Sequence, residues 1–302
     1  MFSNSKSRMI FADIETVPCA WGIKRAMKLE KRGDESAVEE MYAELRKKEH
    51  GGGNEVTQPF PKHCFHRVVT ISCLIREKQE QKDPEFSLVS FPSVKTCQKC
   101  DKREDSESEK DAIVAEREVL SSFLRLYETN FGNTQTFTYN GSGFDLSVIL
   151  QRAVIVGVPL GKFGKRPTQG WNEPSIYHRD NPWFVDLMKV LSLGNTGKAV
   201  PSLNEMLTQM GFPGKMETSG SGVYDLWKER RFKAIRDYND YDAISTYLLF
   251  AAMGYAGGLF TLEQFKEEEL KTLQTYLEEK RAEEEYAHLQ SFLKEWKQVQ
   301  RV

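Results

Sequence analysis

Carboxylates with the potential to do chemistry lie at three separate places in this chain of 302 residues. Asp13 and Glu15 follow a short apolar run, Asp145 follows a glycine-bearing segment, and Asp242 lies in a long apolar stretch. Carboxylates that face one another all stay ionised only when cations neutralise them, and hard oxygen ligands of this kind select Mg²⁺ or Mn²⁺. Two such ions about 4 Å apart stabilise the attacking and leaving oxygens of an in-line phosphoryl displacement. If the fold gathers these four residues, the chemistry that they predict is metal-dependent phosphoryl transfer.

The first pair of acids depends on a β-strand. The segment Arg8–Asp13 is short, apolar and rich in β-forming residues, and Pro18 follows it, so we expect a buried strand that ends there. Side chains alternate along a strand, so Asp13 and Glu15 point to the same face. Asp-x-Glu also occurs by chance in an acidic chain, and on its own the pair favours a strand that ends in solvent.

The other acids depend on helices. In the segment 139–145 (YNGSGFD) a strand stops in a glycine-bearing turn and a helix starts near Asp145. The alternative to a ligand role is that Asp145 simply caps this helix. Tyr238 and Asp242 are four residues apart and share one helical face, whereas Asp240 points elsewhere. A phenol on the face of Asp242 can orient an attacking water. The simpler interpretation is a core tyrosine beside a surface charge.

The elements around these residues predict an α/β fold. Two paired strands are expected at 67–75 and 86–91, followed by a helix, a strand and a second helix at 112–127, 136–139 and 145–156. A meander followed by this alternation favours a mixed sheet flanked by helices.

Two regions are expected to lie outside this sheet. The stretch 93–111 is strongly polar and charged, which predicts a mobile loop inserted in the domain. The stretch 262–300 has apolar residues at spacings of three and four, which predicts helices packed on the domain. We therefore expect a catalytic domain at 1–258 and a C-terminal helical extension at 259–302. A homodimer that forms through this extension is an open alternative.

The polar stretch also holds a C-x-x-C pair, Cys97 and Cys100. A zinc site built on this pair would need His63, Cys64 or His66 as further ligands. Structural zinc sites normally use two close pairs of ligands, and only one clean pair is present. We favour reduced, solvent-exposed thiols in this stretch.

Composition limits the class of protein. The formal net charge is −2, which excludes the blanket basic charge of a protein that grips duplex DNA along its whole surface but leaves room for a local basic groove. No apolar run approaches the length of a membrane span, and the N-terminus lacks the apolar core of a signal peptide. The cysteine count is odd and thinly spread, unlike a disulfide framework. We expect a cytoplasmic protein that does not bind membranes.

The acidic segments resemble the motifs of a known superfamily. Asp13-Ile-Glu-Thr16, the segment 140–145 and Tyr238-x-x-x-Asp242 resemble the three exonuclease motifs of the DEDD superfamily, tyrosine subtype, in order and spacing. More narrowly, the chain resembles the stand-alone predicted 3′ to 5′ exonucleases related to the proofreading domain of family B DNA polymerases. Further matches lie at 184–192, 201–203, 211–215 and 246–250, and the resemblance covers about 8–258.

This resemblance implies a ribonuclease H-like fold, two Mg²⁺ or Mn²⁺ ions and stepwise hydrolysis from the 3′ end of a single-stranded nucleic acid, with DNA expected. By analogy, Asp13 would bridge both ions and Glu15 and Asp242 would hold the one that activates water. Asp145 would help to hold the other ion, and Tyr238 would position the water. One departure is that the family usually has a Cys-Glu pair after the tyrosine, whereas this chain has Asn-Asp there.

Four further residues are candidates for binding the substrate. Thr16, Asn140 and Phe144 lie beside the expected metal ligands in the motifs, so we expect them to touch the terminal nucleotide. Lys215 follows a turn and could meet a phosphate, or could belong to an ordinary solvated loop.

Two other functions stay open. An exoribonuclease would use the same metal cluster, because discrimination at the 2′ position is not legible in the sequence. A catalytically silent nucleic-acid-binding module would keep the scaffold without the chemistry. The intact acids argue against the silent module, because a lost enzyme would be free to drop at least one of them.

Overall fold

A computed structural model of the chain describes residues 7–49, 60–102, 107–168, 173–178, 181–195, 197, 199–214 and 222–299. Its strands are β1 (Arg8–Pro18), β2 (His66–Glu77), β3 (Glu85–Phe91), β4 (Thr134–Thr138) and β5 (Phe184–Asp186). Its α-helices are α1 (Ala20–Met27), α2 (Asp34–Glu49), α3 (Val94–Asp101), α4 (Glu109–Arg125), α5 (Asp145–Val156), α6 (Leu187–Ser192), α7 (Leu203–Met210), α8 (Val223–Lys228), α9 (Phe232–Ala256), α10 (Thr272–Lys280) and α11 (Leu289–Val299). A π-helix, η6 (Gln264–Lys271), precedes α10.

The five strands form one sheet in the order β3-β2-β1-β4-β5. β1, β2 and β3 pair antiparallel, whereas β4 and β5 run parallel to β1. The central strand β1 therefore ends at the same edge as β4 and β5, where the chain turns toward the first residues of the following helices. This mixed sheet with flanking helices confirms the expected α/β fold.

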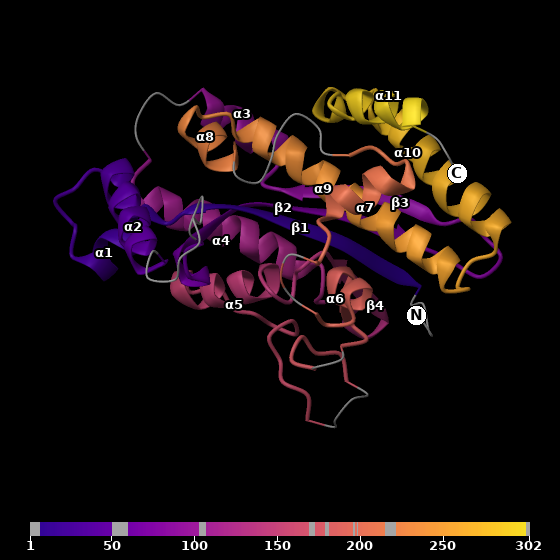
Figure 1. The fold of residues 1–302 in the computed structure, drawn as a ribbon, viewed down its shortest axis with the longest axis horizontal. Coiled ribbons are helices and arrows are strands. Elements are labelled where there is room, and N and C mark those ends of the chain that lie inside the picture. Colours follow the sequence, from indigo (N-terminus) through magenta and orange to yellow (C-terminus); the bar gives the residue numbers. More distant parts are fainter. Residues whose placement is uncertain are drawn as a thin grey trace.

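Helices cover both faces of the sheet (Figure 1). The face that carries Ile10 and Ile14 packs on α4 and α5 in one hydrophobic cluster, and the opposite face, which carries Phe11, packs on α9 in another. The two clusters follow from the alternation of side chains along β1. Among the described residues, no helix is long and apolar enough to cross a membrane.

The C-terminal helices pack on α9 and β3 rather than standing apart (Figure 1). Their buried residues, among them Leu273 and Trp296, belong to the same hydrophobic cluster as Phe11 of the central strand. The Nε of Arg76 donates to Glu269 over 2.7 Å, and both side chains are buried. The residues of α11 that are buried within the chain include Leu289, Phe292, Leu293 and Trp296. The domain boundary at 258 and the homodimer stay predictions.

The polar stretch 93–111 is not only a loop. Residues Val94–Asp101 form α3, and α4 begins at Glu109. The Ser93 side chain caps α3 by accepting a hydrogen bond from the backbone N–H of Thr96, and Cys97 is buried on the face that packs against α9. Composition predicted a mobile loop because few residues here are apolar, yet a cap and two buried side chains are enough for this short helix.

Candidate active site

Three carboxylates meet where the end of β1 faces α9. Asp13, Glu15 and Asp242 each offer an oxygen, and these oxygens all lie within 4.8 Å of one another. Glu15 is buried, and the other two are half-buried. The structure therefore gathers the two acids of the predicted strand with the acid of the predicted helix.

Asp145 faces the same cluster from the first turn of α5. Its side chain is buried, and burial, with further repulsion from Asp186 and Asp242, raises its pKa to about 7. The pKa of Asp13 is raised well above its usual value by burial and then by repulsion from Asp242, Asp145 and Glu15. A site whose burial and acidic groups raise the pKa of both Asp13 and Asp145 is one that a cation would stabilise.

Tyr238 lies one helical turn before Asp242, as the spacing predicted. Its side chain is buried, and its hydroxyl is hydrogen bonded to Asp242. Burial and the nearby carboxylates raise the pKa of the phenol far above its usual range, so Tyr238 remains a hydrogen-bond donor.

The turn that leads into Asp145 is held by Asp186, at the end of β5. Asp186 accepts hydrogen bonds from the backbone N–H groups of Asn140 (2.9 Å) and Ser142 (3.1 Å). The turn is tight, because a Cβ on Gly141 would lie 2.1 Å from an atom of Thr138. Asp186 lies in one of the segments that resemble the family, but no role was predicted for it. The signal in the sequence is a lone acid at the end of a short apolar strand.

Asn239 is a second residue that the sequence analysis did not place in the site. Its side-chain Nδ2 donates to Asp13 Oδ2 over 2.7 Å, and the residue is fully buried. The next residue, Asp240, points to the other side of α9, where it accepts a hydrogen bond of 2.7 Å from Ser72. The Asn-Asp pair that departs from the family pattern thus divides its two side chains between two environments.

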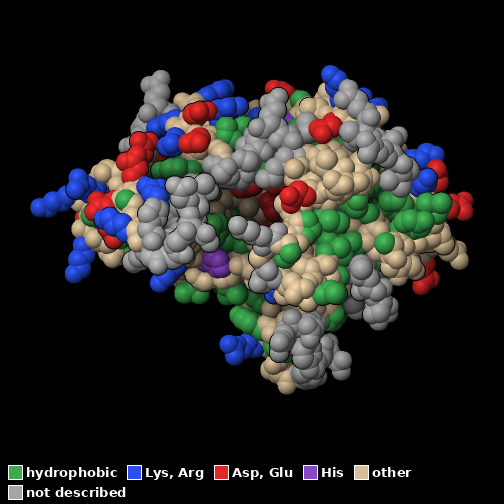
Figure 2. Space-filling model, in the orientation of Figure 1, with side chains coloured by type: hydrophobic (Ala, Val, Ile, Leu, Met, Phe, Trp, Pro, Cys, Tyr) green, Lys and Arg blue, Asp and Glu red, His purple; other side chains and the backbone are tan. Residues whose placement is uncertain are grey.

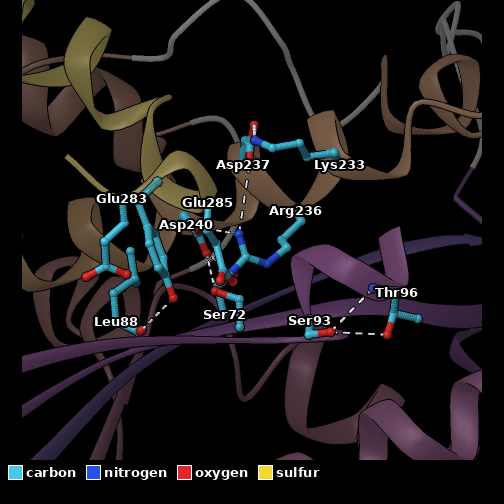
Figure 3. A network of polar contacts seen from close by, with 12 residues as sticks. Ser72, Leu88, Ser93, Thr96, Lys233, Arg236, Asp237, Asp240, Glu283 and Glu285 are labelled. Carbon is cyan, nitrogen blue, oxygen red and sulfur yellow. Dashed lines mark hydrogen bonds and ion pairs between the residues drawn. The ribbon is translucent and has the colours of Figure 1, made fainter. Parts of the chain in front are cut away.

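A buried ionic network fastens this other side of α9 to the C-terminal segment (Figure 3). Arg236 lies between Asp240 (3.4 Å) and Glu285 (2.9 Å), and the Nε2 of His288 lies 3.2 Å from Asp240. Asp237, Asp240 and His288 also lie close enough together to hold a metal ion. However, the Nη1 of Arg236 lies 3.4 Å from Asp240 and 3.9 Å from Asp237, so a guanidinium already occupies the space between the two acids.

A cavity of about 620 Å³ opens onto the acidic cluster. Asp13, Asn140, Tyr238 and Asp242 contribute to its wall. Figure 2 shows a hollow near the middle of the face in view, with acidic side chains deep in it and a histidine at its rim. A larger cavity of about 800 Å³, lined by Trp21 and residues of other helices, holds none of the four carboxylates, so the smaller cavity is the one that matters for the chemistry.

The predicted substrate-binding residues lie in different surroundings. Asn140 lines the cavity, whereas Thr16 and Phe144 are not among its lining residues and instead contact His66. Lys215 lies outside the described residues.

The cysteine pair does not form a metal cluster among the described residues. The groups of His, Cys, Asp and Glu that lie within reach of one ion contain no cysteine in that part of the chain. Burial raises the pKa of Cys97 to about 12, and His63 and His66 are engaged with Ser147 and Thr16. The prediction of solvent-exposed thiols is wrong for Cys97, whose side chain is buried because α3 packs on α9.

Comparisons with known proteins identify a family that matches most of the chain. The family described as predicted 3′-5′ exonuclease related to the exonuclease domain of PolB matches residues 58–296. The match includes Asp145, Tyr238 and Asp242 and begins after β1, so it does not include Asp13 and Glu15. No curated protein matches the chain.

The solved structures that are similar to the chain include the following two. One is a family B DNA polymerase from the hyperthermophilic archaeon Pyrobaculum calidifontis, with 18% identity and a TM-score of 0.43 over 84% of this chain and 25% of that chain. The other is a product-bound exonuclease I, with 12% identity and a TM-score of 0.32 over 86% of this chain and 50% of that chain. The chain thus spans a quarter of the polymerase and half of exonuclease I.

Proposed function

The chain belongs to the family of predicted 3′-5′ exonucleases related to the exonuclease domain of PolB, and we propose that it is a metal-dependent exonuclease that hydrolyses single-stranded nucleic acid from the 3′ end, with DNA as the expected substrate. The observation that carries this proposal is the meeting of Asp13, Glu15 and Asp242, whose oxygens lie within 4.8 Å of one another. The family match supports the reaction class, and the acidic cluster supports the dependence on metal.

The donor set suits Mg²⁺ or Mn²⁺, because it consists of carboxylate oxygens. The raised pKa of Asp13 supports the same assignment, since burial and then its acidic neighbours make the ionised form unfavourable without a cation. We assign a two-ion site to Asp13, Glu15, Asp145 and Asp242. When bound, such ions neutralise the acids and the phosphate and activate the attacking water.

The remaining side chains bind and orient. Tyr238 is a protonated phenol whose hydroxyl donates to Asp242, so its oxygen is placed to accept a hydrogen bond from the attacking water and to orient it. Asn140, Phe144 and Thr16 are assigned to the terminal nucleotide, and Lys215 to a phosphate. Asn239 holds the Asp13 carboxylate by its hydrogen bond of 2.7 Å.

Labelled oligonucleotides test the proposal directly. Single-stranded DNA and RNA of matched sequence, each labelled at the 5′ end, are incubated with the protein in Mg²⁺, in Mn²⁺ and in EDTA. We expect a ladder of products shortened from the 3′ end, stronger for DNA, that EDTA abolishes. Strands labelled at the 3′ end should release their label as a mononucleotide in the first step.

Two variants make the result specific. Asp13→Asn removes a proposed ligand and should abolish the ladder without unfolding the chain. Asp225→Asn is the matched control, because the Asp225 side chain is 66% exposed and forms a surface ion pair with Lys228, three residues later in the chain. Intact substrate under every metal condition, or full activity of Asp13→Asn, would sink the proposal.

A further inference from the structure

Four aromatic side chains form a cluster beside the acidic site, which we call the ring cluster: Phe60, His63, His66 and Phe144. Phe60 stacks on His66, with 4.8 Å between ring centroids and 29° between ring planes. Phe144 meets Phe60, His63 and His66 edge to face, at centroid distances of 5.3, 5.4 and 5.1 Å. The histidines come from the segment that the sequence analysis considered only for zinc.

The ring cluster adjoins the proposed metal ligands through two direct connections. Phe144 immediately precedes Asp145 at the start of α5. Thr16 immediately follows Glu15, and its hydroxyl lies 3.0 Å from the Nδ1 of His66. A nucleotide whose phosphate lies at the acids would therefore have the ring cluster within its reach.

His66 presents an uncharged ring. Its Nε2 lies 3.3 Å from the carbonyl oxygen of Pro61, which can only accept, so Nε2 carries the hydrogen and Nδ1 accepts from Thr16. Burial lowers the pKa of His66 to about 4, which agrees with a neutral imidazole. A neutral ring suits the flat face of a base better than it suits a phosphate.

The ring of Phe60 is largely exposed to solvent although it is packed against other rings. One face of its ring packs on His66, yet 63% of the residue remains exposed to solvent. A large aromatic ring held in place by three others, and open to solvent, offers a preorganised platform for a planar ligand. Bases stack on such platforms in proteins that bind single strands without sequence preference, because every base has a π-face.

We propose that the ring cluster binds the base of the 3′-terminal nucleotide by stacking on Phe60. This inference rests on the proposed exonuclease function and adds a base-binding subsite to it. The subsite reads the presence of a base and not its identity, so the enzyme would degrade strands of any sequence and slow at a 3′ residue that lacks a base.

The test compares two single strands that differ only at the last nucleotide. Both carry a 5′ label; one ends in a normal nucleotide and the other in a tetrahydrofuran abasic residue with the same sugar hydroxyl. We expect the wild-type protein to remove the normal nucleotide with kcat/KM roughly tenfold higher than the abasic residue, mostly through a lower KM. In Phe60→Ala the ratio of the two kcat/KM values should fall to near one, whereas Phe60→Trp should keep a ratio close to that of the wild type.

Controls separate the possible failures. Leu262→Ala removes another exposed apolar side chain, 47% exposed, and should keep the wild-type preference. The stacking subsite would be overturned if the wild type removed the normal and the abasic 3′ residue at equal rates, or if Phe60→Ala kept the wild-type preference. Either result would leave the exonuclease proposal intact. If the wild type cleaved neither substrate, the exonuclease proposal on which the subsite rests would be overturned instead.

Discussion

The side-chain amide of Asn239 donates a hydrogen bond of 2.7 Å to Asp13. This bond joins the helix that carries Tyr238 and Asp242 to the strand that carries Asp13 and Glu15. It also opposes the other influences on Asp13, because it lowers a pKa that burial and three acidic neighbours raise. Asn239 is therefore a positioning residue for a proposed metal ligand.

Asn239→Ala should weaken metal binding. Without the amide, Asp13 keeps its proton to higher pH and loses its fixed orientation, and the loss of such a supporting contact typically costs 10- to 100-fold in metal affinity. We expect the apparent Kd for Mn²⁺, measured by titration calorimetry at neutral pH, to rise by about tenfold or more. Asn195→Ala is the matched control, since Asn195 is exposed and donates only to a backbone carbonyl in its own turn. Equal Mn²⁺ affinity for wild type and Asn239→Ala would remove Asn239 from the site.

The stability of the metal-free protein should fall as the pH rises through the titration of Asp145. The pKa of Asp145 is about 7 in the folded state, against 3.8 for an ordinary aspartate. From about pH 4 to about pH 7 the folded state thus holds a proton that the unfolded state has lost, so the free energy of unfolding decreases with pH. Above about pH 7 both states are ionised and this contribution no longer changes.

Melting curves at several pH values in EDTA measure this effect. The melting temperature of the wild type should drop more between about pH 5 and about pH 8 than that of Asp145→Asn, which has no group to titrate there. Saturating Mn²⁺ should remove the difference, because a cation then replaces the proton. Parallel pH profiles for the two metal-free proteins would contradict the raised pKa.

Local geometry explains what could be predicted from the sequence. The gathering of Asp13 with Glu15 follows from alternation along one strand, and that of Tyr238 with Asp242 from one turn of helix. The contacts that support them join residues far apart in the chain: Asn239 and Asp13 are 226 positions apart. No periodicity records such a pair.

The polar segment shows the opposite limit. Its composition predicted a loop, because few of its residues can be buried. The helix α3 forms there since its cap and its buried face depend on individual residues, Ser93 and Cys97, and on a partner, α9, that is distant in sequence. Average polarity over a segment does not record which single side chains find a partner.

The ionic network behind α9 should be necessary for stability. Asp240 is fully buried and compensates Arg236, which is also buried, so Asp240→Asn leaves a guanidinium with less opposing charge. Breaking a buried pair by removing one partner typically costs about 3–5 kcal/mol. We expect a loss of about 3 kcal/mol in the free energy of unfolding, measured in urea with EDTA present. Asp225→Asn should change the free energy of unfolding by less than about 0.5 kcal/mol, because losing an exposed ion pair costs little. A similarly small change for Asp240→Asn would show that the network adds little to stability.

Tyr238→Phe should separate catalysis from metal binding. The phenol is buried, its raised pKa keeps it protonated, and its hydroxyl is bonded to Asp242 rather than replacing a carboxylate among the proposed ligands. Removing one oxygen leaves the ring in its packing with Val17 and Ile235, so the fold should be kept. The attacking water loses the hydroxyl oxygen that is proposed to orient it, and we expect kcat to fall by about 10- to 100-fold. This is at or below the loss that removing a general acid or base usually causes. The apparent Kd for Mn²⁺ should stay within about twofold of the wild-type value, because all four carboxylates remain. A matched fall in both kcat and Mn²⁺ affinity would mean that Tyr238 acts by holding Asp242, whereas an unchanged kcat would exclude the hydroxyl from the reaction.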